Sequence, residues 1–157
     1  TTPMQLFMPE GQTLRAALAA AVPAGAKPGS PQLRKAVLGV FKEMLGHVRR
    51  ALRGRFESDH DAAALIHESA RLVDMLLSGL FDYSRGLFFP GDKAPEIAFI
   101  ALGGYGRGEL FPHSDIDLMF LHNGGEQERT DGLIEFIYYI LWDIILSNYM
   151  QQLLMVI

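Results

Sequence analysis

The chain has 157 residues, of which 49% are hydrophobic and 20% are charged, and this size predicts one domain or one domain with an appendage. Its formal net charge of −4 gives no whole-chain reason to bind nucleic acid or an acidic lipid surface. The absence of cysteine excludes disulfides, thiolate catalysis and Cys-ligated zinc, and it fits a reducing compartment, so we expect a cytoplasmic protein.

The N-terminal part of the chain has the apolar spacing of helices, and we predict a helical lead-in over residues 1–90. The first residues have no basic region followed by an apolar run, so we expect no signal peptide. Ser30 followed by Pro31 is a good helix start, because a hydroxyl can cap the helix and proline suits its first position. Ser58 or Asp59 could cap the next helix. The predicted helices lie at about residues 12–22, 31–55 and 59–84.

Basic side chains gather in the second of these helices, where residues 34–55 hold half of the chain's 14 lysines and arginines. No aromatic residues alternate with them in the manner of a nucleic-acid-binding surface. We interpret them as a solvated helix face, with docking against an acidic partner as the alternative, and expect no nucleic-acid partner.

After about residue 90 the pattern changes, and we predict a second unit over residues 91–157. The runs EIAFIAL (96–102) and DIDLMFL (115–121) are short, apolar and rich in β-branched or aromatic residues, which predicts two buried strands. A helix is expected from residue 126 or 130 onward. Helices followed by short strands predict an α+β fold.

The segment 133–157 is the most apolar part of the chain. Asp143 lies near its middle, whereas a membrane-spanning helix needs about 20 mostly apolar residues without a central charge. We therefore predict a core helix and no membrane span. Such a helix without its packing partners would favour self-association through its apolar face.

Two carboxylates, Asp115 and Asp117, stand one residue apart at the start of the second predicted strand. Residues two apart on a strand point to the same side, so these two carboxylates should share one face. Their mutual repulsion would be relieved by a divalent cation, and hard oxygen ligands favour Mg²⁺ or Mn²⁺. We predict that Asp115 and Asp117 form a metal site for a nucleotide.

Four further residues between the two strands could contact the nucleotide. Gly103 and Gly104 let the backbone turn tightly and approach a ligand, and their N–H groups could hold phosphate oxygens at the start of a short helix over 105–110. Arg107 could contact the triphosphate as a planar fork. Ser114 could hydrogen-bond phosphate or orient the neighbouring Asp115.

The combination of an apolar strand, Gly-Gly, about ten residues and then Asp-x-Asp in a second strand resembles the nucleotidyltransferase superfamily that includes DNA polymerase β. It is neither a P-loop, since G-K-[ST] is missing, nor a dinucleotide-binding fingerprint. The longer string ALGGYGRGELFPHSDIDLMFL is similar to the N-terminal nucleotidyltransferase domain of bacterial PII uridylyltransferases. This resemblance covers roughly residues 60–143.

The resemblance implies a function and roles for these residues. Gly103 and Gly104 would form the nucleotide-binding turn, and Asp115 and Asp117 would ligate Mg²⁺. The reaction would transfer UMP from UTP to a tyrosine of the nitrogen-signalling protein PII. The superfamily also takes a third carboxylate from a later strand, and none is identifiable after Asp143.

Two alternatives remain open at the level of the sequence. One is a different nucleotidyltransferase, such as the adenylyltransferase that acts on glutamine synthetase, because those enzymes carry a similar S-D-I-D strand. The other is a truncated, non-catalytic module that binds a nucleotide or a partner without turnover, which the unidentified third carboxylate favours.

Overall fold

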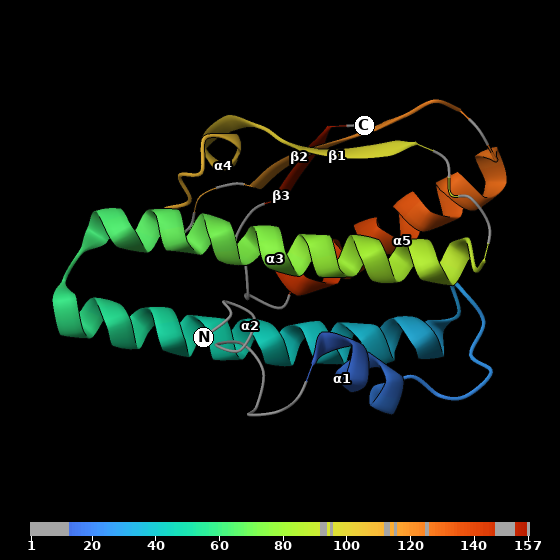
Figure 1. Ribbon diagram of the computed structural model, residues 1–157, viewed down its shortest axis with the longest axis horizontal. Coiled ribbons are helices and arrows are strands. Elements are labelled where there is room, and N and C mark those ends of the chain that lie inside the picture. The colour runs from blue at the N-terminus through green and yellow to red at the C-terminus, as the bar shows by residue number, and fades with distance from the viewer. Residues whose placement is uncertain are drawn as a thin grey trace.

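The computed structural model describes residues 13–91, 94, 96–111, 114, 116–124, 126–146 and 153–156. The elements in chain order are α1 (Leu14–Ala21), α2 (Pro31–Asp59), α3 (Ala62–Phe88), β1 (Ile97–Ala101), α4 (Gly103–Gly106), β2 (Ile116–His122), α5 (Gln127–Leu146) and β3 (Leu153–Val156). The two long helices α2 and α3 run antiparallel, with the sheet on the far side of α3 from α2 (Figure 1). This arrangement confirms the predicted α+β fold class.

The helix ends follow from local capping. The Ser30 hydroxyl accepts a hydrogen bond from the Leu33 amide at 3.3 Å, and proline occupies the first turn of α2, as the sequence predicts. The residue that caps α3 is Asp61, whose carboxylate accepts from the Ala64 amide at 2.9 Å, so the prediction of Ser58 or Asp59 is wrong.

Both long helices extend beyond their predicted ends, α2 to Asp59 and α3 to Phe88. Nothing between residues 55 and 59 interrupts the helix, and an ion pair from Arg53 to Glu57 supports its last turns. His60 then adopts a left-handed conformation (φ 57°), which ends α2 and starts the reversal into α3.

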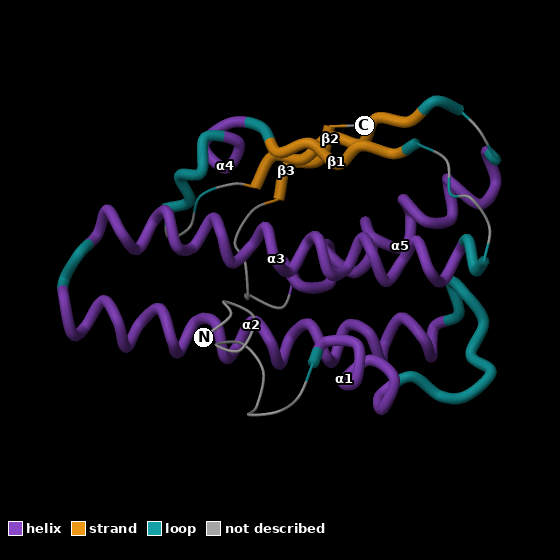
Figure 2. Tube along the Cα trace, viewed as in Figure 1, coloured by secondary structure: helices purple, strands orange, loops and turns teal. Residues whose placement is uncertain are grey.

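The sheet is mixed, and its strand order is β1-β2-β3. The three strands lie together on one side of α3 (Figure 2). Strands β1 and β2 pair antiparallel, from Ile97 opposite His122 to Ala101 opposite Leu118. Strands β2 and β3 pair parallel, with Asp117 opposite Leu154. The side chains that alternate with Asp117 along β2 are buried: Ile116, Leu118 and Phe120. Asp117 therefore lies on the face of β2 that points away from the core.

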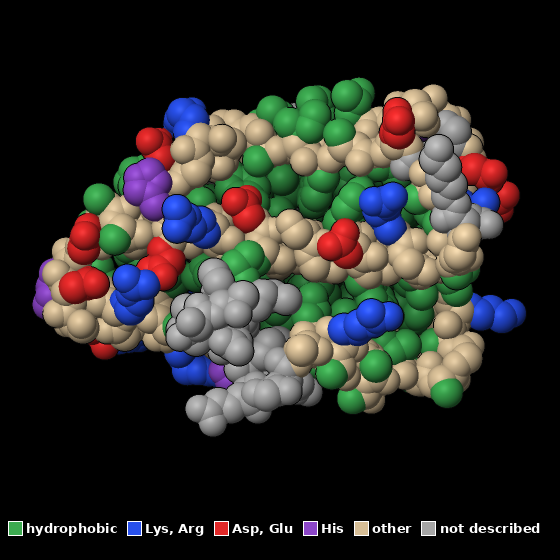
Figure 3. Space-filling view, in the orientation of Figure 1, with side chains coloured by type: hydrophobic (Ala, Val, Ile, Leu, Met, Phe, Trp, Pro, Cys, Tyr) green, Lys and Arg blue, Asp and Glu red, His purple; other side chains and the backbone are tan. Residues whose placement is uncertain are grey.

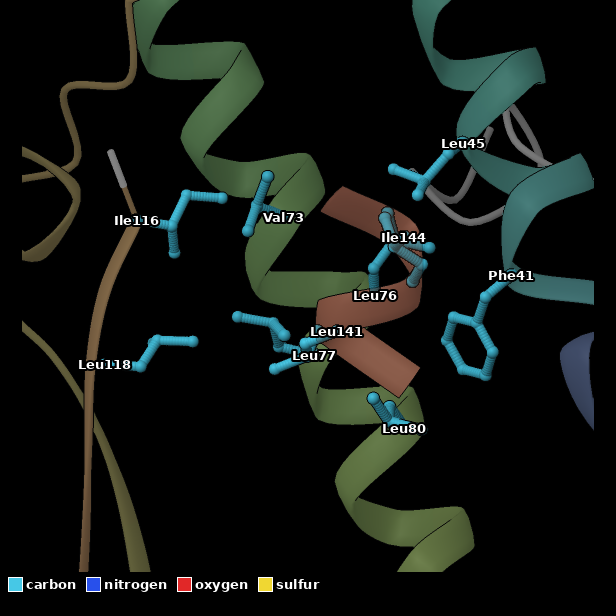
Figure 4. Close-up of a pocket in the computed structure, with 10 residues that line it drawn as sticks. All are labelled: Phe41, Leu45, Val73, Leu76, Leu77, Leu80, Ile116, Leu118, Leu141 and Ile144. Atoms are coloured by element: carbon cyan, nitrogen blue, oxygen red, sulfur yellow. The ribbon is translucent and has the colours of Figure 1, made fainter. Parts of the chain in front are cut away.

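The core fills the space between β2 and the helices α2, α3 and α5. Here apolar side chains surround a cavity of about 20 Å³, to which Ile116 and Leu118 contribute from the sheet (Figure 4). The cavity has no polar lining, so we expect it to be dry. The buried cluster includes residues from both sides of the proposed boundary near residue 90. The division into two units at that point remains a prediction.

The C-terminal segment differs from its prediction as a continuous helix over 133–157. Helix α5 ends at Leu146, and Leu153–Val156 form β3. The apolar side of α5 is buried in the core, through Leu133, Phe136, Ile137, Ile140, Leu141 and Ile144. This side of α5 therefore packs within the chain, and self-association through the C-terminal segment remains a prediction. No helix in the described ranges has the length and apolar character needed to cross a membrane.

Candidate functional site

The junction of β1 and β2 brings together two residues that the sequence predicts for the site. The Leu102 amide donates to the Asp117 carbonyl at 2.9 Å, which extends the strand pairing and carries the next residue, Gly103, alongside Asp117. Gly103 has φ +58°, and a Cβ atom built on it would lie 2.5 Å from Asp117 Oδ2. Glycine is required here on two counts, backbone conformation and space.

The turn itself is built differently from its prediction. The short helix α4 spans Gly103–Gly106, not residues 105–110, so the two glycines begin the helix instead of preceding it. The chain then folds back, since the amides of Arg107 and Glu109 both donate to the Gly104 carbonyl, at 3.1 and 3.0 Å. A Cβ on Gly104 would approach the Glu109 carbonyl oxygen to 3.1 Å. Gly104 thus allows close packing of the returning chain.

Arg107 is held at the edge of this turn. Its Nη1 donates to the Gly103 carbonyl at 3.1 Å, and its Nε lies 3.5 Å from Glu109 Oε2. The Arg107 side chain is nevertheless 67% exposed. The guanidinium is therefore positioned beside the turn and accessible to an anionic ligand, and its contact with a triphosphate remains a prediction.

Ser114 stabilises the chain just before β2. Its hydroxyl donates to the Phe111 carbonyl at 2.8 Å, and its amide donates to the same carbonyl at 3.0 Å. These bonds fix the approach to the strand that carries Asp117. A contact of Ser114 with phosphate remains a prediction.

Among the described residues of the site, Asp117 has the properties of a cation ligand. Its carboxylate is partly exposed and lies against Gly103, and among the described residues we find no hydrogen bond or ion pair to it. A hard oxygen donor of this kind fits Mg²⁺ or Mn²⁺. Asp115 lies outside the described residues, so its pairing with Asp117 remains a prediction. No group of three or more potential metal ligands occurs within the described ranges.

A third carboxylate does not come from the strand that lies beside Asp117. The partner of Asp117 in the parallel pairing is Leu154, and all four residues of β3 are apolar in sequence (LLMV). The parallel strand that borders the site therefore supplies no acid at this register.

One polar contact of the site was not predicted from the sequence. The Tyr105 hydroxyl donates to Asp74 Oδ1 at 2.6 Å, which connects the turn with α3. Burial, together with the hydrogen bond and the charge of Asp74, raises the pKa of Tyr105 well above its usual range. Since 31 residues separate the two partners, no local pattern could have revealed the pair.

Charged side chains of both signs lie near one another on the surface. On the face shown in Figure 3, acidic and basic side chains are interspersed over the helices. Within the basic stretch of α2, Arg53 pairs with Glu57 and Arg55 pairs with Glu68. Part of the positive charge of α2 is thus neutralised within the chain.

Comparison with known proteins shows what this part of the chain is similar to. The model of the nucleotidyltransferase domain family matches residues 91–153. The chain is 39% identical over 112 residues to a bifunctional uridylyltransferase/uridylyl-removing enzyme of Stutzerimonas stutzeri (strain A1501) and 38% identical over 112 residues to that of Pseudomonas fluorescens (strain SBW25). The enzyme of the same description from Azotobacter vinelandii (strain DJ) is 38% identical over 115 residues.

Each of these alignments covers 71% of this chain and 12% of the relative, so the chain spans about an eighth of the length of the curated relatives that it matches. No solved structure matches the chain.

Proposed function

We propose that the site of this chain binds UTP with a divalent cation and transfers UMP to a tyrosine of PII. The proposal starts from the similarity of the chain to nucleotidyltransferase domains and to bifunctional uridylyltransferase/uridylyl-removing enzymes. The observation that carries the proposal is the approach of Gly103 to the carboxylate of Asp117, with room for no side chain between them. A backbone free of side chains beside a carboxylate lets a phosphate group and its cation approach together.

The cation would be held by Asp117, together with Asp115 if the two share one face as predicted. When bound, Mg²⁺ or Mn²⁺ would neutralise charge on the phosphate oxygens of the nucleotide. The remaining work belongs to the chain: the turn positions the triphosphate, and Arg107 lies beside it with an exposed guanidinium. Positioning and charge stabilisation supply most of the catalysis in phosphoryl transfer reactions, and the same reasoning applies to a nucleotidyl group.

The donor and acceptor rest on the relatives. The names of the similar enzymes state uridylyl transfer, which favours UTP as the donor. In the proposed reaction, the tyrosine oxygen of PII forms a bond to the α-phosphorus while the bond to the β-phosphate oxygen breaks, and pyrophosphate leaves. The tyrosine proton passes to solvent or to a base. A cytoplasmic location also remains a prediction.

A second candidate function is nucleotide binding without turnover. It is favoured by Leu154, which occupies the position beside Asp117 on the neighbouring parallel strand, where no acid is available to activate the attacking hydroxyl. The two candidates make the same prediction for UTP binding and differ only in transfer.

A transfer assay separates these candidates. The chain is incubated with Mg²⁺, α-labelled UTP and purified PII, and label on a PII tyrosine is identified by peptide mass spectrometry. We expect labelled PII, and no label when Mg²⁺ is removed. UTP binding without label would favour the non-catalytic module. Label from α-labelled ATP on glutamine synthetase, with none from UTP on PII, would favour the adenylyltransferase and overturn the proposal.

A further inference from the structure

The turn that carries Gly103 and Gly104 is attached to α3 at three points along its length. The Tyr105 hydroxyl donates to Asp74 at 2.6 Å, and the Leu110 amide donates to the Ile66 carbonyl at 3.2 Å. His67 lies between these points, and its Nδ1 donates to the Gly108 carbonyl at 2.9 Å. Three residues of α3 thus hold the segment that follows Gly103, two through their side chains and one through its backbone carbonyl.

The bond to Asp74 is the one that reaches the helix α4 itself. Tyr105 lies inside α4, two residues after Gly103, and only 4% of its surface is exposed. Its hydroxyl would lose this partner in a part-buried position if Asp74 were absent, which is unfavourable for a polar group. A carboxylate acceptor makes this bond stronger than one between neutral groups. The Tyr105 hydroxyl is a protonated donor at neutral pH, and its raised pKa extends this state to more alkaline pH.

The opposite side of α4 is closely packed on β1. A Cβ atom on Gly106 would lie 2.7 Å from the Ala101 carbonyl oxygen, so the backbone of α4 lies directly against the end of β1. Helix α4 is therefore fixed between the end of β1 and α3. Because a helix of four residues has little stability of its own, these outside contacts, together with the strand pairing next to Leu102, hold Gly103 beside Asp117.

We propose that Asp74 is a positioning residue of the nucleotide site: acting through Tyr105, it holds the Gly103 turn against Asp117 and thereby increases nucleotide affinity. The inference rests on the proposed function for its ligand and adds a residue outside the matched range 91–153. Helix α3 is then part of the site's support and not only a lead-in to it.

The test uses two variants that remove the bond and one that keeps an acceptor for it. Asp74→Ala removes the acceptor, and Tyr105→Phe removes the donor while retaining the buried ring. Asp74→Asn retains an acceptor oxygen without the charge and should recover much of the effect. Asp82→Ala is the matched control, because Asp82 is an exposed carboxylate two turns further along the same helix.

Two measurements are made on each variant of the whole chain. Hydrogen–deuterium exchange reports the opening of the segment 103–110 without any ligand, and calorimetric titration with UTP and Mg²⁺ reports affinity. We expect Asp74→Ala and Tyr105→Phe each to speed exchange in this segment and to weaken UTP binding, both by about tenfold, since a part-buried charge-assisted bond is lost. Asp82→Ala should change neither quantity.

Each further outcome has a defined meaning. Faster exchange spread equally over α2, α3 and β2 would show that the variants only destabilise the fold, which would overturn the inference. Unchanged affinity despite a loosened turn would also overturn it. If the unaltered chain binds no UTP but Asp74→Ala still loosens the segment 103–110 selectively, the proposed function fails while the attachment of the turn to α3 is supported.

Discussion

Substitution of Gly103 by alanine separates the effect of backbone strain from the effect on Asp117. At φ +58° an alanine is disfavoured by about 1 kcal/mol relative to glycine. The added Cβ would lie 2.5 Å from Asp117 Oδ2, a separation that real Cβ contacts do not show, so the carboxylate has to move away. Because the colliding atom is the end of a side chain, a rotation relieves the contact at small energetic cost but removes the carboxylate from its position beside the turn.

Gly108→Ala is the matched control for this experiment. Gly108 also has a positive φ of +74°, but a Cβ there meets no atom within 4 Å. Urea unfolding should therefore show similar destabilisation in the two variants, about 1 kcal/mol each. Calorimetric titration with UTP and Mg²⁺ should show at least a tenfold loss of affinity in Gly103→Ala and little change in Gly108→Ala. Equal affinities in the two variants would refute the assignment of the Gly103–Asp117 contact to the nucleotide site.

Three further predictions concern stability. The pKa of Tyr105 is higher in the folded chain than in the unfolded chain, where tyrosine ionises near pH 10. The stability that the protonated hydroxyl contributes is therefore complete below about pH 10 and falls above it, because the unfolded chain then ionises first. Urea unfolding between pH 9 and 11 should show a loss that is steeper in the unaltered chain than in Tyr105→Phe, by up to about 1.4 kcal/mol per pH unit, and parallel slopes would contradict this. Leu118→Ala should reduce the free energy of unfolding by about 2–5 kcal/mol, because Leu118 is 2% exposed and borders an existing cavity; a loss below about 1 kcal/mol would mean that this region is loosely packed. Val73→Ile adds a methylene toward the same cavity and should stabilise the chain by up to about 0.8 kcal/mol in thermal unfolding, whereas destabilisation would indicate that the cavity cannot accept it.

Much of the architecture could be predicted because the relevant signals are local. The apolar spacing of α2 and the Ser30-Pro31 start appear directly in the sequence and in the structure. The two short apolar runs became β1 and β2 within one residue of their predicted ends. The juxtaposition of Gly103 and Asp117 also follows from local features, since adjacent antiparallel strands bring the end of one beside the start of the other.

Other features depend on contacts that no local pattern encodes. A short apolar run such as LLMV suits a helix or a strand equally, and its pairing with β2 decides the outcome. The Tyr105–Asp74 bond joins residues from different elements, and no motif in the sequence around Asp74 indicates this contact. The start of α4 at Gly103 was missed because glycine is a poor helix former, and packing against β1 and α3 overrides that preference.

Metal-dependent UTP binding to Asp117→Asn tests most directly whether Asp117 is a cation ligand in a UTP site. The substitution keeps the size of the side chain and removes its charge. Titration with UTP should show binding that requires Mg²⁺ in the unaltered chain, and a loss of at least tenfold in Asp117→Asn, while Asp82→Asn on the exposed side of α3 binds normally. Equal Mg²⁺-dependent affinity for UTP in Asp117→Asn and in the unaltered chain would contradict the account.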